Sequence, residues 1–170
     1  LSTVLLPSTV TGIALTAIYA KIGWTNTMLP LIIPIWFGGG AMNIFLVRQF
    51  MRNVPDSYVE SAVIDGASSW RIFWEIMMPM IKPILIFLGV STFIACWNDF
   101  QGPLTYLASD TSKSTWTLSL AIYEDFHDAS TAKMNIQMAV SVIMMIPCVV
   151  IFAVFQKQMI QGVSSAGVKG

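Results

Sequence analysis

Apolar residues fall into long runs along this chain, and short polar stretches separate the runs. Residues 1–20, 22–47 and 134–156 contain no Asp, Glu, Lys or Arg, and a shorter charge-free run covers residues 83–98. A membrane helix needs about 20 mostly apolar residues to cross roughly 30 Å of hydrocarbon. The pattern therefore predicts spanning helices at about residues 29–50, 83–98 and 135–155.

Helix breakers interrupt the earlier apolar runs. Pro30, Pro34 and the glycines at positions 38–40 lie inside the predicted 29–50 helix. Such breakers occur in membrane helices where neighbouring helices or water satisfy the freed backbone groups, so this helix is expected to face protein. Residues 1–20, interrupted by Pro7 and Gly12, are expected to end one spanning helix and begin a re-entrant or interfacial one. Because the chain opens at Leu1 inside an apolar segment, we expect it to be the later part of a longer protein.

Composition agrees with a membrane protein. Hydrophobic residues make up 55% of the 170 residues, charged residues only 11%, and the mean hydropathy is +0.70. Soluble domains are about a quarter charged, so we predict an all-α, polytopic integral membrane protein. The net charge is zero and no basic stripe occurs, which argues against a nucleic-acid partner. Cys96 and Cys148 lie in apolar runs without metal-ligand spacing, so no cofactor or metal is expected.

The basic residues predict the orientation of the chain. Residues near the polar stretch 54–80 and in the C-terminal tail hold six of them, whereas the other side holds three, Lys21, Lys113 and Lys133. Cytoplasmic segments carry the excess of Lys and Arg. The stretch 54–80 and the C-terminus are therefore predicted to be cytoplasmic, and the loop 101–133 extracytoplasmic.

The polar stretch 54–80 predicts two short helices joined by a bend. Ser57 and Glu60 have the spacing of a capping box, which would begin the first helix. Asp65-Gly66 would end it, because glycine tolerates the left-handed conformation that follows a helix. Ser68 or Ser69 would cap a second helix over residues 70–78, and Pro79 would end that helix. A simpler alternative is an amphipathic connector that lies flat on the lipid surface and inserts the aromatic side chains of Trp70, Phe73 and Trp74 into the membrane interface.

The same stretch resembles a known motif. Glu60-Ser61-Ala62, Gly66 after three residues and Ile76-Met77-Met78-Pro79 after nine more match the EAA loop, E-A-A-x3-G-x9-I-x-L-P. This loop belongs to permease subunits of binding-protein-dependent ABC importers. Two positions depart from the motif. Ser61 replaces an alanine, which is a small change, and Met78 replaces a leucine, which conserves the side-chain volume. The segments "IDGASSWRIFWEIMMPMIKP", "WNDF" and "SSAGVKG" resemble the carbohydrate, maltose-transporter-like branch.

The resemblance implies a function, partners and a location. It implies an ATP-driven sugar importer in a bacterial or archaeal inner membrane, with the first two or three of six helices absent from this chain. The partners would be cytoplasmic ATPase subunits, a second permease subunit, an extracytoplasmic solute-binding protein, the lipid bilayer and the sugar. The positions carried over for ATPase coupling are Glu60, Ser61, Ala62, Asp65, Gly66, Ile76 and Pro79, of which Gly66 would set the bend.

A second group of candidates lies where the 83–98 run ends. Asn98 and Asp99 can offer hydrogen bonds to sugar hydroxyls, while Phe93 and Trp97 can supply apolar faces for sugar C–H surfaces. Asn43 is a weaker candidate for the same pathway. Asn98 and Asp99 could also hold helices together around the pathway. The simpler alternative is an interfacial tryptophan belt beside a solvated Asp99.

No motif for hydrolysis or phosphate binding occurs in the chain, so the chain itself is not expected to be an enzyme. His127 lies near Asp125 and Asp128, which suggests a proton relay. A lone histidine in an acidic loop is more often simply solvated, and we favour that interpretation. The sequence is compatible with three functions. They are a transport subunit for a sugar or another solute, a membrane assembly or signalling subunit that docks a cytoplasmic partner, and an intramembrane enzyme without supporting motif.

Overall fold

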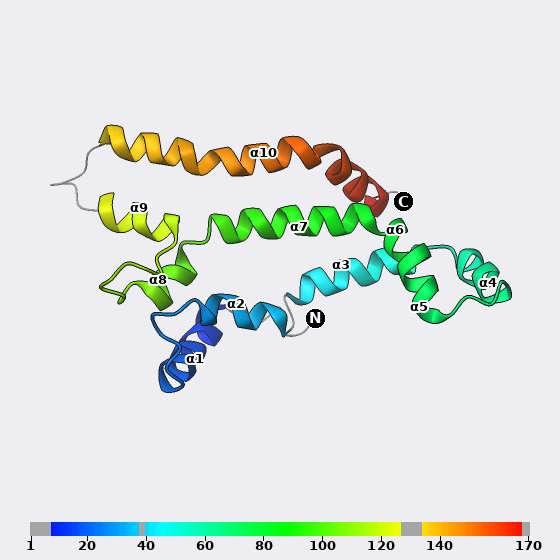
Figure 1. Ribbon diagram of the computed structural model, residues 1–170, viewed down its shortest axis with the longest axis horizontal. Coiled ribbons are helices and arrows are strands. Elements are labelled where there is room, and N and C mark those ends of the chain that lie inside the picture. The colour runs from blue at the N-terminus through cyan, green and yellow to red at the C-terminus, as the bar shows by residue number, and fades with distance from the viewer. Residues whose placement is uncertain (1–7, 38–39, 127–133, 168–170) are drawn as a thin grey trace. The chain divides into compact units, whose positions relative to one another are not determined.

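The computed structural model describes residues 8–37, 40–126 and 134–167, and side chains within residues 11–160 of these ranges. All regular elements in these ranges are helical, which confirms the predicted all-α class. Contacts group the chain into two compact units, residues 1–41 with 93–150 and residues 42–92 with 151–170. Figure 1 labels the helices in chain order.

The first unit contains α1 (Ser8–Lys21), α2 (Leu29–Trp36), α8 (Gln101–Leu107) and α9 (Leu118–Phe126), with parts of α7 (Lys82–Trp97) and α10 (Met134–Gly167). Helices α2 and α8 contact each other. The buried ring of Tyr19 stacks on Trp24 at 5.6 Å and meets the edge of Tyr106 at 5.5 Å. The N–H of Asn26 donates to the Tyr106 carbonyl at 2.8 Å. These contacts join the turn after α1 to the segment that follows α7.

The second unit contains most of α3 (Ala41–Arg52), then α4 (Asp56–Ile64), α5 (Ser69–Arg71), the π-helix η2 (Ile72–Met77) and α6 (Met78–Met80). Its core is a cluster of Phe50, Ile81 and Ile84, against which partly buried residues of α3, α6 and α7 pack. Helix α4 contacts η2. The segment 54–80 is therefore a folded helical substructure attached to a small apolar core.

Two helical stretches among the described residues are long and apolar enough to cross a membrane, Leu29–Arg52 and Met134–Ile160. A third span arises if the segments Ser69–Met80 and Lys82–Trp97, which meet at a bend of 69°, count as one. None of the most apolar window of Met134–Ile160 is buried within the chain. Its apolar side chains are thus available to lipid or to another subunit.

Helix boundaries differ in three places from those that the hydrophobic pattern predicts. The 29–50 region consists of α2 and α3 on either side of residues 37–40, and Gly40 has a φ of +107°. Helix α10 (Met134–Gly167) continues beyond residue 155 into the polar tail. The predicted outer loop 101–133 contains α8 and α9, which are too short, at 7 and 9 residues, to give a clear period along the sequence.

Candidate functional site

The first helix of the segment 54–80 begins two residues earlier than its sequence indicates. Helix α4 begins at Asp56, directly after Pro55. The backbone of Pro55 is extended, with a φ of −61° and a ψ of 133°. Ser57 therefore lies inside the helix, and its carbonyl accepts from the Ser61 hydroxyl at 2.7 Å. The predicted capping box of Ser57 and Glu60 is wrong, because proline fixes the entry to the helix.

The end of α4 forms as predicted. Helix α4 ends at Ile64, and Gly66 follows with a φ of +76°. The N–H of Ala67 donates to the Ala62 carbonyl at 2.9 Å, and that of Gly66 donates to Val63 at 3.0 Å. This pair of bonds is a Schellman motif, which satisfies the last carbonyls of a helix. It gives the bend a defined geometry.

The second helical segment is longer than predicted. Ser68 caps it, since its hydroxyl oxygen accepts from the Arg71 N–H at 3.3 Å. The prediction that Pro79 ends this segment is wrong, because helical structure continues to Met80. A proline inside a helix lacks an N–H and crowds the carbonyl of the preceding turn. Pro79 lies in the first turn of α6, where a missing N–H costs no helical bond, directly after the π-helix η2, whose last bond runs from the Met78 N–H to the Phe73 carbonyl.

Part of the predicted coupling set gathers at one hollow on the segment. This hollow, of about 180 Å³, is lined by Ala62, Asp65, Ala67, Arg71, Ile72, Glu75 and Ile76. Arg71 and Glu75 form an exposed ion pair at 2.8 Å on its rim. The other motif residues, Glu60, Ser61, Gly66 and Pro79, do not line it and are exposed.

The bend also exposes apolar side chains. Val63 and Ile64 are 59% and 85% exposed, while Ala62 is buried to 7%. Asp65, the C-cap of α4, is exposed beside them. An exposed helix end with apolar and acidic side chains next to a small hollow is suited to contact another protein.

The candidates at the end of α7 (Lys82–Trp97) have structural partners. The rings of Phe93 and Trp97 stack at 5.8 Å, and the Trp97 indole donates to the Met144 carbonyl at 2.9 Å. Asn98 donates to the Ile94 carbonyl at 2.8 Å and to the Cys148 sulfur at 3.6 Å. These bonds attach the end of α7 to α10.

Asp99 is held in place by the helix and loop that follow it. Its carboxylate accepts from the Gly102 N–H at 3.1 Å, and its carbonyl accepts from the Ser119 hydroxyl at 2.6 Å. The Gly102 N–H belongs to the first turn of α8, where backbone donors have no helical partner. Asp99 thus satisfies a backbone donor in the first turn of α8, whose N-cap is Phe100, and connects this turn to α9. Asn43 is half-buried in α3, in the other unit, and His127 lies outside the described residues.

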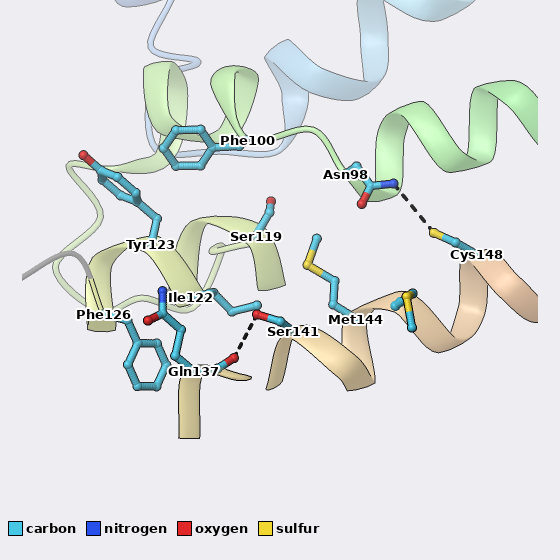
Figure 2. A pocket seen from close by; sticks show the side chains of 11 residues that line it. Asn98, Phe100, Ser119, Ile122, Tyr123, Phe126, Gln137, Ser141, Met144 and Cys148 are labelled. Carbon is cyan, nitrogen blue, oxygen red and sulfur yellow. Dashed lines mark hydrogen bonds between the residues drawn. The ribbon is translucent and has the colours of Figure 1, made fainter. Parts of the chain in front are cut away.

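A pocket of about 670 Å³ opens beside Asn98 in the first unit, as Figure 2 shows. Its polar side chains come from three elements, namely Asn98 at the end of α7, Ser119 and Tyr123 of α9, and Gln137 and Ser141 of α10. Its apolar lining consists of Phe100, Ile122, Phe126, Met144, Met145 and Cys148. Phe93, Trp97 and Asp99 lie nearby along the chain but do not line it.

Of the pathway candidates that the sequence offers, only Asn98 lines this pocket, and the other polar residues of its lining are not among them. Gln137 and Ser141 stand one helical turn apart in a mostly apolar run, and the Ser141 hydroxyl donates to the Gln137 carbonyl at 2.8 Å. Residues four apart lie on the same helix face. A carboxamide and a hydroxyl on one face of a mostly apolar helix mark a polar face, which is the part of this pocket that the sequence shows.

Comparison with known proteins gives consistent matches. Residues 3–165 match the family described as "Binding-protein-dependent transport system inner membrane component". The chain is 34% identical over 130 residues to the melibiose/raffinose/stachyose import permease protein MelC of Bacillus subtilis (strain 168), covering 76% of this chain and 46% of that protein. It is 33% identical over 159 residues to the galactooligosaccharides transport system permease protein GanQ of the same organism, covering 93% and 55%.

A further relative has a phosphorylated solute in its name. The sn-glycerol-3-phosphate transport system permease protein UgpE of Yersinia pestis is 34% identical over 139 residues, which cover 82% of this chain and 47% of that protein. The chain thus spans about half the length of the curated relatives that it matches.

Proposed function

Because the chain belongs to the family of inner-membrane components of binding-protein-dependent transport systems, we propose that it is part of the permease subunit of an ATP-driven sugar importer. In this proposal the permease pairs with a second permease subunit and receives solute from an extracytoplasmic binding protein. Cytoplasmic ATPase subunits supply the energy. Two relatives named as permeases for oligosaccharides support a sugar as the solute.

The observation that carries the coupling role is the bend at Gly66. The Schellman motif there fixes the angle between α4 and the helix capped by Ser68, and it exposes Asp65 beside the hollow that Ala62 and Ile76 line. A helix–bend–helix substructure attached to the core of Phe50 and its neighbours can transmit movement to the membrane helices. We assign the ATPase contact to this substructure, on the cytoplasmic side.

The membrane arrangement completes the proposal. We infer spanning segments at about residues 29–50, 83–98 and 135–155, with residues 54–80 and the C-terminus in the cytoplasm and residues 101–133 outside. The basic residues support this orientation. The pathway would pass the end of α7, where Asn98 is found.

Transport by reconstituted vesicles tests this function. Vesicles carrying the full-length permease with its partner permease and ATPase subunits are mixed with the binding protein and a labelled sugar, first melibiose. We expect accumulation with ATP at the ATPase side and none with ADP. A membrane assembly or signalling subunit would bind the ATPase without accumulating any solute, and that result would refute the proposal.

A second solute class is tested in the same vesicles. The relative named for sn-glycerol 3-phosphate favours a phosphorylated solute as the alternative substrate. Accumulation of labelled sn-glycerol 3-phosphate, with no accumulation of any neutral sugar, would assign that class instead.

A further inference from the structure

The pocket beside Asn98 has the chemistry of a site for a neutral sugar. None of the described residues that line it is Asp, Glu, Lys, Arg or His. A phosphate group removed from water needs a cation or several aligned N–H donors, and no cationic side chain is present here. The lining therefore favours an uncharged ligand over a phosphorylated one.

The polar groups of the pocket are carboxamides and hydroxyls. The described bonds of the Asn98 side chain use its nitrogen, and Figure 2 shows this nitrogen directed at Cys148, which leaves the amide oxygen as an acceptor. Gln137 is half-buried, and its carboxamide has no hydrogen-bond partner among the described residues. A carboxamide offers two donors and an acceptor, which suits the hydroxyls of a sugar.

Aromatic rings supply the other half of sugar recognition. Phe100 and Tyr123 meet at 4.6 Å with their planes tilted by 51°, and Phe126 lies on the same helix as Tyr123 (Figure 2). Apolar walls with a few placed polar groups are typical of small-molecule sites, and a volume of about 670 Å³ lies in their usual range of roughly 300–1,000 Å³.

We propose that this pocket, with Asn98 and Gln137 as its hydrogen-bonding groups, binds a neutral sugar within this permease subunit. The proposal rests on the proposed function and adds to it a binding site on this chain itself. Gln137 is then a specificity-determining residue, because its carboxamide faces the bound sugar from α10 while Asn98 faces it from α7.

Protection of Cys148 from alkylation tests binding without relying on transport. Cys148 lines the pocket, so a bound sugar will slow its reaction with N-ethylmaleimide. The full-length permease complex, without binding protein, carries Cys96→Ser and serine at any other reactive cysteine. Melibiose, raffinose, stachyose and sn-glycerol 3-phosphate serve as probes. We expect at least one neutral sugar to protect Cys148 and sn-glycerol 3-phosphate to give no protection.

A matched pair of substitutions identifies the residue responsible. Gln137→Leu removes a carboxamide that lines the pocket, whereas Asn135→Leu removes one from the same helix two positions away, outside the lining. Loss of one or two hydrogen bonds raises the half-protecting sugar concentration by roughly 3- to 10-fold in Gln137→Leu. No shift is expected in Asn135→Leu.

The outcomes separate the site from the function. Equal half-protecting concentrations in the two variants, no protection by any of the three sugars, or protection by sn-glycerol 3-phosphate instead would each overturn the site. If the vesicles accumulate sugar while Cys148 stays unprotected, the site fails and the importer function stands. If Gln137→Leu raises the sugar concentration that half-protects Cys148, but the complex shows no ATP-driven uptake, the site stands and the importer function is refuted.

Discussion

The N–H of Ala67 donates to the carbonyl of Ala62 at 2.9 Å, across the turn that ends α4. Between the two residues lies Gly66, with a φ of +76°. The bond places the start of the next helix, capped by Ser68, in a defined position relative to α4. This single turn therefore sets the geometry of the surface that we assign to the ATPase.

Gly66→Val tests that turn. A Cβ at Gly66 meets nothing within 4 Å, so the cost comes from the backbone conformation rather than from a clash. The left-handed conformation costs an L-residue roughly 1–2 kcal/mol, and a β-branched residue disfavours it further. We expect normal membrane insertion but ATP hydrolysis that no longer drives uptake in vesicles.

Gly66→Asn is the control for this substitution, because asparagine enters the left-handed region more readily. Its coupling should lie between those of the wild type and Gly66→Val. Wild-type sugar uptake in the valine variant would rule out a coupling role for the bend.

The orientation is tested by two cysteine probes. Ser68→Cys and Ser112→Cys both place a thiol at an exposed position, in a background without Cys96 and Cys148. The basic residues predict that the first is cytoplasmic and the second extracytoplasmic. An impermeant maleimide added to intact cells should label only Ser112→Cys. Labelling of Ser68→Cys under those conditions would reverse the topology.

Local chemistry explains which parts of the segment 54–80 could be predicted. Gly66 and Ser68 act through bonds to residues within five positions, so their roles are visible in the sequence. Ser57 and Glu60 have the same kind of local signal, yet Pro55 begins the helix earlier. The rule that a proline ends a helix assumes that the preceding turn is α-helical. The turn before Pro79 is a π-helix, so the rule gives the wrong boundary here.

The pocket could not be predicted because its residues are distant along the chain. Asn98 and Cys148 are 50 residues apart, and their contact depends on the packing of α7 against α10 within the first unit. Periodicity identifies a helix and its polar face, but it does not say which other helix that face meets. Gln137 and Ser141 can therefore be recognised in the sequence as polar residues of a mostly apolar helix. Only the structure shows which residues of other helices they meet.

The loop after α8 should be stable across physiological pH. Hydroxyl and N–H groups of Ser112 and Thr115 donate to Asp110, and these bonds lower the pKa of its carboxyl below the ordinary value. A lowered pKa in the folded state stabilises the loop above the ordinary carboxyl pKa of about 3.9, and this contribution is lost as pH falls through the folded value. Amide exchange at Thr115, corrected for the intrinsic rate, should show constant protection from pH 8 to pH 5.

Asp110→Asn should weaken the same loop at pH 7, because an amide has one oxygen acceptor where the carboxylate has two. Exchange at Thr115 should become faster. Asp125→Asn is the control, since it breaks only the exposed ion pair with Lys113 at 3.1 Å, which contributes little. Equal exchange in the two variants would contradict the role of Asp110 in the loop.

Gly102→Ala should disturb the start of α8. A Cβ there would lie 2.9 Å from Leu31 Cδ2 and still closer to the Asp99 carboxylate, so both side chains must move. Gly89→Ala in α7 is the control, because nothing lies within 4 Å of its added Cβ and alanine favours a helix by up to about 1 kcal/mol. We expect a lower melting temperature for Gly102→Ala and an equal or higher one for Gly89→Ala. The reverse order would contradict the contact of α8 with α2.

Asp99 can serve the fold, the pathway or both, and a series of three substitutions separates these roles. The carboxylate accepts from the Gly102 N–H in the first turn of α8, a bond whose loss costs about 0.5–2 kcal/mol at a helix start. Asp99→Asn and Asp99→Ser keep an oxygen acceptor, whereas Asp99→Leu does not. We therefore expect thermal stability near the wild type for Asn and Ser and a clear loss for Leu.

Transport by the same variants then tests the pathway role for which the sequence makes Asp99 a candidate. Asn keeps the reach and one acceptor of the carboxylate, whereas Ser supplies a shorter side chain that still suits a helix start. If Asp99 also meets the sugar, uptake at equal membrane abundance should be largely kept in Asp99→Asn and reduced in Asp99→Ser, although both are stable. Uptake that follows melting temperature alone across the three variants would limit Asp99 to holding α8, and Asn98 would remain the pathway residue at the end of α7.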